Sequence, residues 1–254
     1  MIDKLVSSLR AVADLVMPRI CLCCGRELEL WEEHLCQSCM EDLPRTRYWK
    51  LRENPMAEAY NHLIQMNMGE DAHYQPYGYA VALYFYRGGF RHISKSLKYK
   101  RNFETGRCFA RLLGRSLAES PYFGDVDLVV PVPLHWMRRW QRGYNQAEII
   151  AREVARELGV ECCPELVVRA RRTRTQTHLH IEGRTRNVAG AFCIGKIPPR
   201  LAAVAPRHIL LIDDVFTTGA TAASCEAAIH AGLSTIIPPA HLRISIATLA
   251  CVER

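Results

Sequence analysis

The residues best suited to chemistry stand together near the end of the sequence. Two adjacent acids, Asp213 and Asp214, follow four consecutive apolar residues, Ile209 to Ile212. Such an apolar run fits a strand of a parallel sheet that is buried on both faces. Ligands of open α/β sheets bind at the carboxyl ends of the strands. Because paired carboxylates accept hydrogen bonds from two neighbouring hydroxyl groups, we expect a sugar-like ligand at these acids.

A loop of small polar residues comes directly after the acids. It contains Thr217, Thr218, Gly219, Ala220 and Thr221 and leads into an apolar-striped segment that predicts a helix. Backbone amides converge at a helix N-terminus, and the helix dipole favours an anion there. The acids and the loop together predict a sugar phosphate, with its diol on the acids and its phosphate in the loop. Taken separately, a strand end and an ordinary helix N-cap explain the same residues without a ligand.

Arginines earlier in the chain indicate a second anion site. Arg138, Arg139 and Arg142 lie between a predicted strand that ends at Pro133 and a predicted helix that begins at Asn145. Guanidinium groups bind phosphate oxygens in a fork geometry, and a helix N-terminus adds amide donors. We expect a pyrophosphate near Arg139 and Arg142. The alternative is a solvated basic loop.

A third basic segment runs from Arg169 to Asn187. Its arginines are Arg169, Arg171, Arg172, Arg174, Arg184 and Arg186, against a single acid, Glu182. A loop this polar does not belong in a core, so we interpret it as a cover over a polyanion or as a nucleic-acid contact.

Four cysteines near the start of the sequence form two C-x-x-C pairs. Cys21 with Cys24 is the first pair, and Cys36 with Cys39 is the second. Two such pairs place four thiolates at the spacing of a tetrahedral zinc site. We favour structural zinc over redox chemistry, because a closed four-thiolate site leaves no open position for a substrate. Cys23 and, less favourably, His34 are alternative ligands.

Cysteine content and the first residues bear on the compartment. Eleven cysteines are an odd number, in a chain too long for a disulfide-stapled secreted domain. The first twenty residues carry Asp3 and Asp14 and lack the unbroken apolar core of a cleavable signal. Their apolar residues instead follow helical spacing up to Pro18, which fits a core-facing helix better than a membrane-surface helix. We therefore expect a reducing cytoplasm and no membrane span.

These residues must be positioned by a chain of 254 residues, 49% hydrophobic, with a net charge of +7. That composition excludes a disordered chain, and the charge favours anionic partners. From Tyr77 onward, strands alternate with helices, the pattern of an α/β domain with a mainly parallel sheet flanked by helices. The expected strands are 79–86, 128–133, 165–169, 209–215 and 244–249, and the expected helices are 91–100, 104–119, 145–158 and 221–230. We predict a zinc module at residues 1–44, a linker at 45–76 and the α/β domain at 77–254.

The segment from Ile212 to Thr221 resembles the signature of the type I phosphoribosyltransferases, which bind 5-phosphoribosyl 1-pyrophosphate (PRPP). The resemblance implies that Asp213 and Asp214 hold the ribose hydroxyls and that residues 217–221 hold the 5′-phosphate. It also implies that magnesium enters with PRPP and bridges its pyrophosphate and ribose oxygens.

The combination of a four-cysteine module with a PRPP-type domain resembles the ComF family, which includes competence and GntX-like proteins. The motifs that carry the resemblance are PRICLCCG, LCQSCMEDLP, YRGGFRHISKSLKYKRN, VPVPLHWMRRWQRGYNQAE and IDDVFTTGAT. The C-terminal tail and the segment from about Tyr48 to Tyr77 depart from the family pattern. The resemblance implies a cytoplasmic protein linked to the uptake of single-stranded DNA or to nucleotide metabolism, with competence-machinery proteins as partners.

Two functions stay open at this point. The chain is a phosphoribosyltransferase acting on PRPP and an unidentified acceptor, or it is a non-catalytic module that senses PRPP or binds phosphate groups of single-stranded DNA. Lys95, Lys98, Lys100 and Arg101 around Tyr99 combine charge with a stacking ring, as single-strand binding requires, although a solvated helix end explains them equally well. The residues give no indication of the oligomeric state.

Overall fold

The structure is a computed structural model of the chain and describes residues 18–68, 75–99, 103–134, 143–169, 191–199, 201 and 205–253. Its helices are α2 (Gln37–Glu41), α3 (Pro55–Met68), α4 (Phe90–Tyr99), α5 (Phe103–Ala118), α7 (Gln146–Leu158) and α9 (Ala220–Leu233), with short 3₁₀ turns η1 (Tyr48–Lys50) and η3 (Pro239–His241). Its strands are β1 (Ala80–Phe85), β2 (Leu128–Pro131), β3 (Glu161–Cys162), β4 (Val167–Arg169), β5 (Phe192–Ile194), β6 (His208–Phe216) and β7 (Arg243–Cys251). The helix predicted before Pro18 lies outside the described residues.

Five parallel strands form the central sheet in the order β1-β7-β6-β2-β3. β4 and β5 form a separate antiparallel pair. β7 lies inside the sheet between β1 and β6, and eight of its nine residues are buried. The C-terminal stretch that departs from the family pattern therefore supplies an interior strand. The expected α/β fold with a mainly parallel sheet is confirmed.

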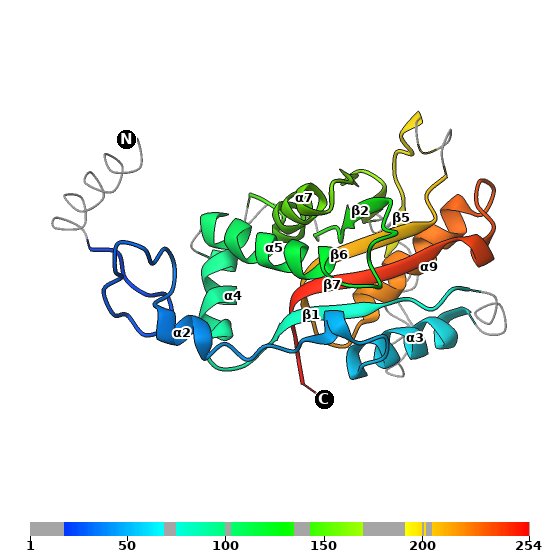
Figure 1. Cartoon of the computed structure of the whole chain (residues 1–254). Coiled ribbons are helices and arrows are strands. Elements are labelled where there is room, and N and C mark those ends of the chain that lie inside the picture. Colours follow the sequence, from blue (N-terminus) through cyan, green and yellow to red (C-terminus); the bar gives the residue numbers. More distant parts are fainter. Residues whose placement is uncertain are drawn as a thin grey trace, which may run out of the picture.

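Helices cover both faces of the sheet (Figure 1). α5 and α7 pack on one face, where Phe109, Leu113 and Ile150 meet the β6 residues Leu210 and Ile212. α3 and α9 pack on the other face, over the alternate β6 residues Ile209 and Leu211. This alternation is what a strand buried on both faces requires, because successive side chains point to opposite sides.

α7 begins and ends as its sequence predicts. The side-chain oxygen of Asn145 accepts a hydrogen bond from the Ala147 amide at 3.2 Å, and Gly159 ends the helix with a φ of 70°. The side chain of Glu148 pairs with Arg152 at 2.8 Å. Asn145 also donates to the carbonyl of Val132 at 3.1 Å, so the start of α7 is tied to the residues that follow β2.

Part of the segment predicted to be a linker is helical and packed. Asn54 caps α3, because its side-chain oxygen accepts from the amides of Met56 and Ala57, each at 3.0 Å. Ala57, Tyr60 and Met56 are buried against the sheet. None of the described helices is long and apolar enough to cross a membrane.

A polar network that includes the buried residues His208 and Ser245 joins the starts of β6 and β7. His208 Nδ1 lies 2.7 Å from Asp125 Oδ1, and His208 Nε2 lies 2.7 Å from Ser245 Oγ. Asp125 also accepts from Arg243 at 2.9 Å. The order of the three side chains is that of a serine-hydrolase triad, but Ser245 is fully buried and accepts a hydrogen bond from the Tyr79 amide. No substrate reaches this hydroxyl, so the network holds strands together.

This network predicts a measurable pH dependence of stability. Burial lowers the pKa of His208, and the neighbouring Asp125 offsets this only in part. The unfolded chain therefore binds a proton more readily than the folded one. The free energy of unfolding falls as the pH drops below about 6.5, the pKa of an unperturbed histidine.

Urea unfolding at several pH values between about pH 7.5 and about pH 5.5 measures the decrease in the free energy of unfolding. His208→Asn is expected to have a shallower pH dependence than the wild type in this window. His241→Asn removes an exposed histidine and is expected to keep the wild-type dependence. An unchanged dependence in His208→Asn would contradict the assignment.

Candidate functional site

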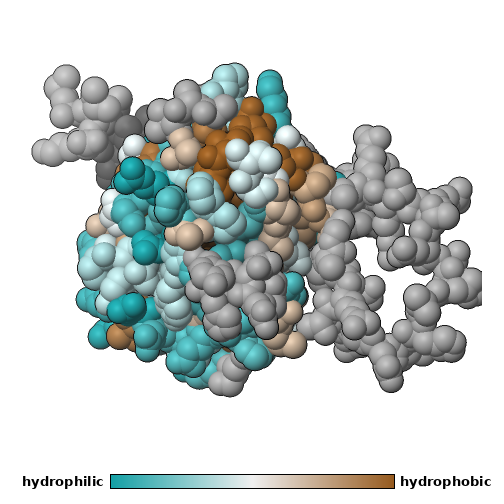
Figure 2. Space-filling model, turned by 90° about the vertical axis from the view of Figure 1, so that its right-hand side faces the viewer, coloured by the Kyte–Doolittle hydropathy of each residue, from teal (hydrophilic) through white to brown (hydrophobic). Residues whose placement is uncertain are grey.

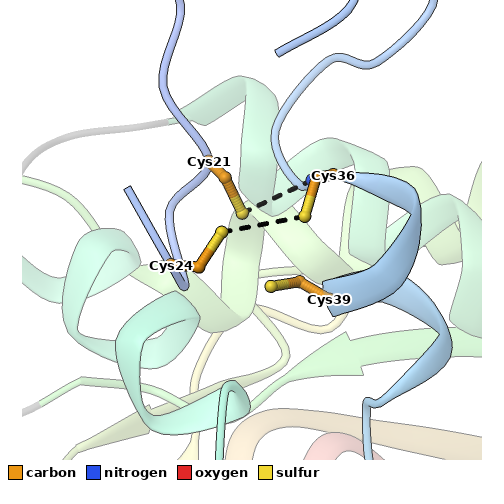
Figure 3. A group of neighbouring side chains, drawn as sticks. All are labelled: Cys21, Cys24, Cys36 and Cys39. Atoms are coloured by element: carbon orange, nitrogen blue, oxygen red, sulfur yellow. Dashed lines mark hydrogen bonds between the residues drawn. The ribbon is translucent and has the colours of Figure 1, made fainter. Parts of the chain in front are cut away.

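The four predicted zinc ligands come together in one cluster. The sulfur atoms of Cys21, Cys24, Cys36 and Cys39 all lie within 4.8 Å of one another (Figure 3). Gly25, directly after the second cysteine, donates its amide to the carbonyl of Cys21 at 3.0 Å and has a φ of 76°, a conformation that favours glycine. Cys36 is the N-cap of α2, and Cys39 lies inside that helix. This donor set and spacing are compatible with a structural zinc ion.

Electrostatics in the cluster favour thiolates at two positions. Burial raises the pKa of Cys21, but hydrogen bonds from the backbone of Cys24, Cys36 and Cys23 outweigh it and lower the pKa to about 6. A backbone hydrogen bond from Cys39 is the main cause of the lowered pKa of Cys36. Since a metal binds the thiolate form, the lowered pKa values of Cys21 and Cys36 are compatible with a role as zinc ligands.

Neither of the two alternative ligands belongs to the group of four sulfurs, although Cys23 lies next to it and contacts Cys39. Cys23 donates to the carbonyl of Gly89 at 3.3 Å, where α4 begins. Burial, followed by the charges of Cys21, Cys24 and Cys36, raises its pKa to about 11. His34 groups instead with Glu33 and Cys108. Cys23 therefore fastens the module to α4.

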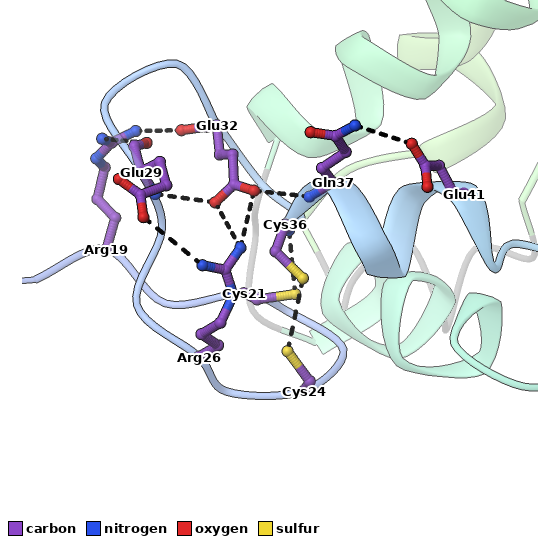
Figure 4. Close-up of polar contacts among 9 residues, drawn as sticks. All are labelled: Arg19, Cys21, Cys24, Arg26, Glu29, Glu32, Cys36, Gln37 and Glu41. Atoms are coloured by element: carbon purple, nitrogen blue, oxygen red, sulfur yellow. Dashed lines mark hydrogen bonds and ion pairs between the residues drawn. The ribbon is translucent and has the colours of Figure 1, made fainter.

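Glu32 holds the two cysteine turns in place (Figure 4). Its side chain is buried, and its carboxylate accepts from the amides of Glu29 and Gln37 at 2.9 and 2.7 Å. The same carboxylate pairs with Arg26 at 2.9 Å, beside the first turn, while Gln37 begins α2. The sequence does not single this residue out, because it is one of several glutamates in the stretch between the two cysteine pairs.

The two candidate acids lie inside β6 and not after it. β2 pairs with β6 only as far as Ile212, whereas β7 continues to pair with Asp213 and beyond. Both acids are therefore exposed in part at the side where β2 has ended. Asp214 donates its amide to Asp213 Oδ1 at 2.8 Å.

Strand geometry separates the two carboxylates. Asp213 follows the alternation of Ile209 and Leu211 and lies on the face covered by α9, where its charge acts on the buried thiol of Cys225. Asp214 therefore points to the opposite face. The two carboxylates therefore do not lie side by side on one face of β6. A ligand that contacts both carboxylates must lie across the edge of the strand.

The predicted phosphate loop connects the end of β6 to the start of α9. Gly219 is buried and caps α9 with a φ of 83°, while Thr217, Thr218 and Thr221 are exposed. The Thr218 hydroxyl accepts from the Ala220 amide at 3.4 Å. The loop thus opens the N-terminus of a 14-residue helix at the sheet edge that holds the two acids.

Gly219→Ala tests this loop. A Cβ atom at this position would lie 2.6 Å from the Phe216 ring and 3.0 Å from a methyl group of Leu63, at a φ that disfavours alanine. We expect a destabilisation of about 1 to 3 kcal/mol, since both strain and overlap must be relieved. Thermal unfolding measures it. Gly124→Ala, where no atom lies within 4 Å of the new Cβ, is the control. Equal stability of the two variants would contradict the assigned geometry.

Arg139 and Arg142, with Arg138, lie outside the described residues, as does the basic loop from Arg171 onward. Arg169 lies within the described residues, and its guanidinium group lies over the ring of Phe192 at 5.1 Å. Its positive charge acts to lower the pKa of Cys225, whereas the negative charge of Asp213 acts to raise it.

A cavity of about 830 Å³ opens beside this site. Its walls come from the end of β2, the start of α7, β3 and the turn after it, β4, and residues that follow β5. The charged residues that line it are Glu148, Arg152, Glu161, Glu165, Arg169 and Lys196. Because Pro131 lines the cavity and pairs with Ile212, the cavity lies one strand away from the two acids.

Comparisons with known proteins give named relatives. The chain is 31% identical to competence protein F of Haemophilus influenzae over 132 residues, which is 51% of this chain and 56% of that protein. It is 28% identical to the DNA utilization protein YhgH of Escherichia coli over 212 residues, 82% of this chain and 89% of that protein. The YhgH protein of Salmonella typhi is 35% identical over 130 residues, 55% of its length. No protein-family model matches the chain.

The fold and the cysteine cluster together define an α/β protein with a parallel sheet and an N-terminal module that fits zinc. The relatives add a likeness: the chain is similar to proteins named for competence and for DNA utilization. Competence protein F and the Salmonella YhgH protein are matched over about half of their length.

Proposed function

We propose that the chain binds PRPP, with magnesium, at the edge of the sheet where β6 ends. The observation that carries the proposal is the order of the elements at this edge. A buried strand is followed by two partly exposed acids, by a loop in which Gly219 has a positive φ, and by a helix N-terminus. Carboxylates suit the ribose hydroxyls, and amides at a helix N-terminus suit the 5′-phosphate.

Each group has a distinct task in this proposal. Asp213 and Asp214 accept from the ribose hydroxyls from the two faces of β6, so the sugar lies across the strand edge. Residues 217–221 hold the 5′-phosphate, and Arg139 and Arg142 hold the pyrophosphate. Magnesium, which favours substrate phosphates and keeps several waters, enters with PRPP.

If the chain is a transferase, its chemistry is electrostatic. The carbon that bears the pyrophosphate becomes positively charged as that group leaves, and the arginines stabilise the departing anion. The cavity beside the acids has room for an acceptor, and its charges of both signs suit a polar one.

Calorimetric titration tests the binding proposal directly. PRPP with magnesium is expected to bind with a one-to-one stoichiometry, and ribose 5-phosphate more weakly, because it lacks the pyrophosphate. Pyrophosphate release in the presence of bases and amines tests turnover. Absence of PRPP binding to the folded protein would refute the proposal.

The names of the relatives favour a second function, in the handling of DNA. One relative is named a competence protein and others DNA utilization proteins. We extend this to single-stranded DNA as a ligand, bound through the arginines of the loop from Arg169 to Asn187, and to competence-machinery proteins as partners. Affinity for an oligonucleotide should fall steeply with salt, and less steeply in Arg171→Ala with Arg174→Ala. An unchanged slope would exclude this loop as the contact.

We also propose a cytoplasmic location. Each of the eleven cysteines is a free thiol in the structure, which suits a reducing compartment.

A further inference from the structure

A second cavity lies between α3 and α9, at the end of the sheet where β7 begins. Its volume is about 220 Å³, room for roughly seven water molecules. Its walls are Asn61, Ile64, Gln65, Gln75, Pro76, Tyr77, Glu226, His230 and Ile244. α3 and α9 lie side by side in the fold (Figure 1), and the cavity lies at the end of the molecule that Figure 2 faces. That end is mostly hydrophilic, with one hydrophobic area (Figure 2).

The cavity contains a buried carboxylate that is only half satisfied. Glu226 is 1% exposed, and one of its oxygens lies 3.2 Å from His230 Nε2. Its other oxygen, Oε2, is buried and has no hydrogen-bond partner among the described residues. An unpaired oxygen of a buried carboxylate costs stability, because it has lost its water and gained nothing in return.

Two tyrosine hydroxyl groups also lack hydrogen-bond partners among the described residues. The hydroxyl of Tyr77 lines the cavity, and that of Tyr60 lies within electrostatic reach of Glu226; both are buried and without a partner among the described residues. Burial and the charge of Glu226 raise the pKa of Tyr60, so its hydroxyl stays neutral. Asn61, by contrast, is fully engaged with Ala57 and Gly78.

These polar groups determine which kind of ligand the cavity can bind. The carboxylate oxygen accepts hydrogen bonds and attracts positive charge, and tyrosine oxygens accept hydrogen bonds as well. None of the described residues that line the cavity is lysine or arginine. Ile64, Pro76 and Ile244 supply apolar walls on which a short hydrocarbon chain packs. A divalent metal ion is a poorer match, because calcium and magnesium prefer more carboxylates and waters than one glutamate provides.

We propose that this cavity is a binding site for a small primary amine, with its ammonium group on Glu226 and Tyr77 and its alkyl chain against Ile64 and Ile244. α9 carries Thr221 in its first turn and Glu226 and His230 further along. The amine site therefore lies on the same helix as the proposed phosphate loop but at the other end of the sheet. The proposal does not depend on PRPP binding.

Titration of the full-length protein with n-propylamine hydrochloride, followed by backbone amide NMR, tests the proposal. We expect saturable shifts confined to α3, α9 and the residues before β1, at concentrations up to about 50 mM, which saturate a millimolar site. Propan-1-ol, of the same shape without the charge, is expected to bind much more weakly. Sodium and potassium chloride at equal concentrations are the ionic controls.

Glu226→Gln preserves the shape of the side chain and removes its charge. We expect its affinity for propylammonium to fall by about 10- to 100-fold, the effect of losing a charge-assisted hydrogen bond. Without ligand, it is expected to be as stable as the wild type or more stable, because burying an amide costs less than burying a carboxylate whose Oε2 has no partner among the described residues. Glu58→Gln, on the exposed side of α3, should bind like the wild type. Tyr77→Phe removes only a hydroxyl and should weaken binding without unfolding the protein.

Three results would overturn the proposal. The first is unchanged amine affinity in Glu226→Gln and Tyr77→Phe. The second is equal binding of propan-1-ol, sodium or potassium. The third is absence of saturable binding, which would show a cavity that holds water only.

Discussion

Cys36→Ser is expected to release the metal from the N-terminal module and to unfold that module while the sheet stays intact. Between Pro18 and Pro44, the buried hydrophobic residues are Cys21, Leu35, Cys36 and Leu43, and two of these are candidate ligands. So small a core does not hold two turns and a five-residue helix by itself. Structural zinc binding supplies about 10 to 16 kcal/mol in comparable small modules, and that energy is folding energy.

Elemental analysis should find about one zinc ion per wild-type chain and almost none in Cys36→Ser. Protease digestion is expected to cleave the variant within residues 18–44 and to leave the sheet resistant. Cys23→Ser is the matched control, because it changes a neighbouring thiol that bonds to Gly89 outside the cluster. Full zinc content in Cys36→Ser, or loss of zinc in Cys23→Ser, would show that the ligands are assigned wrongly.

The elements around β6 were predictable because their patterns are strong. The run Ile209 to Ile212 is apolar without a break, so a doubly buried strand was predicted, and it formed. The predicted helix at 145–158 carries a capping residue at one end and a glycine at the other, and both act as expected. These signals are local, so sequence alone reveals them.

Other features depend on contacts that the sequence does not display. β3 and β5 have two and three residues, too few for a period to emerge. The helix of the predicted linker begins at Asn54 and Pro55, a usable start signal, but its burial depends on α9 and β1, which come later in the chain. Glu226 looks like an ordinary helical acid until α3 covers it. Interactions of this kind are decided by tertiary packing.

The opposed faces of Asp213 and Asp214 follow from a strand that contains both residues. The expected strand at 209–215 already included them, although the two acids were interpreted together as one site. The strand continues through both residues because β7 pairs with them, so the side chains must diverge. A ligand that contacts both carboxylates of the proposed site must therefore reach both faces of β6.

Asp213→Ala with Asp214→Ala is expected to weaken PRPP binding by about 100-fold or more, since each lost charged hydrogen bond contributes 1.5 to 3 kcal/mol. Each single variant should lose only part of this, because the two carboxylates approach the ribose from opposite faces of β6. The double variant should fold normally, since both side chains are partly exposed at the strand edge and such changes alter stability by about 0.5 kcal/mol or less.

Calorimetric titration with PRPP and magnesium measures the affinities, and thermal unfolding checks the fold. Glu41→Ala with Asp42→Ala removes an exposed adjacent acidic pair from the cysteine module and changes the net charge equally. This control should bind PRPP like the wild type, which separates a local contact from a general effect of charge. If the Asp213 and Asp214 double variant kept the wild-type affinity, the sheet edge at β6 would not be the ribose site. If it lost affinity only together with its thermal transition, the two acids would be structural.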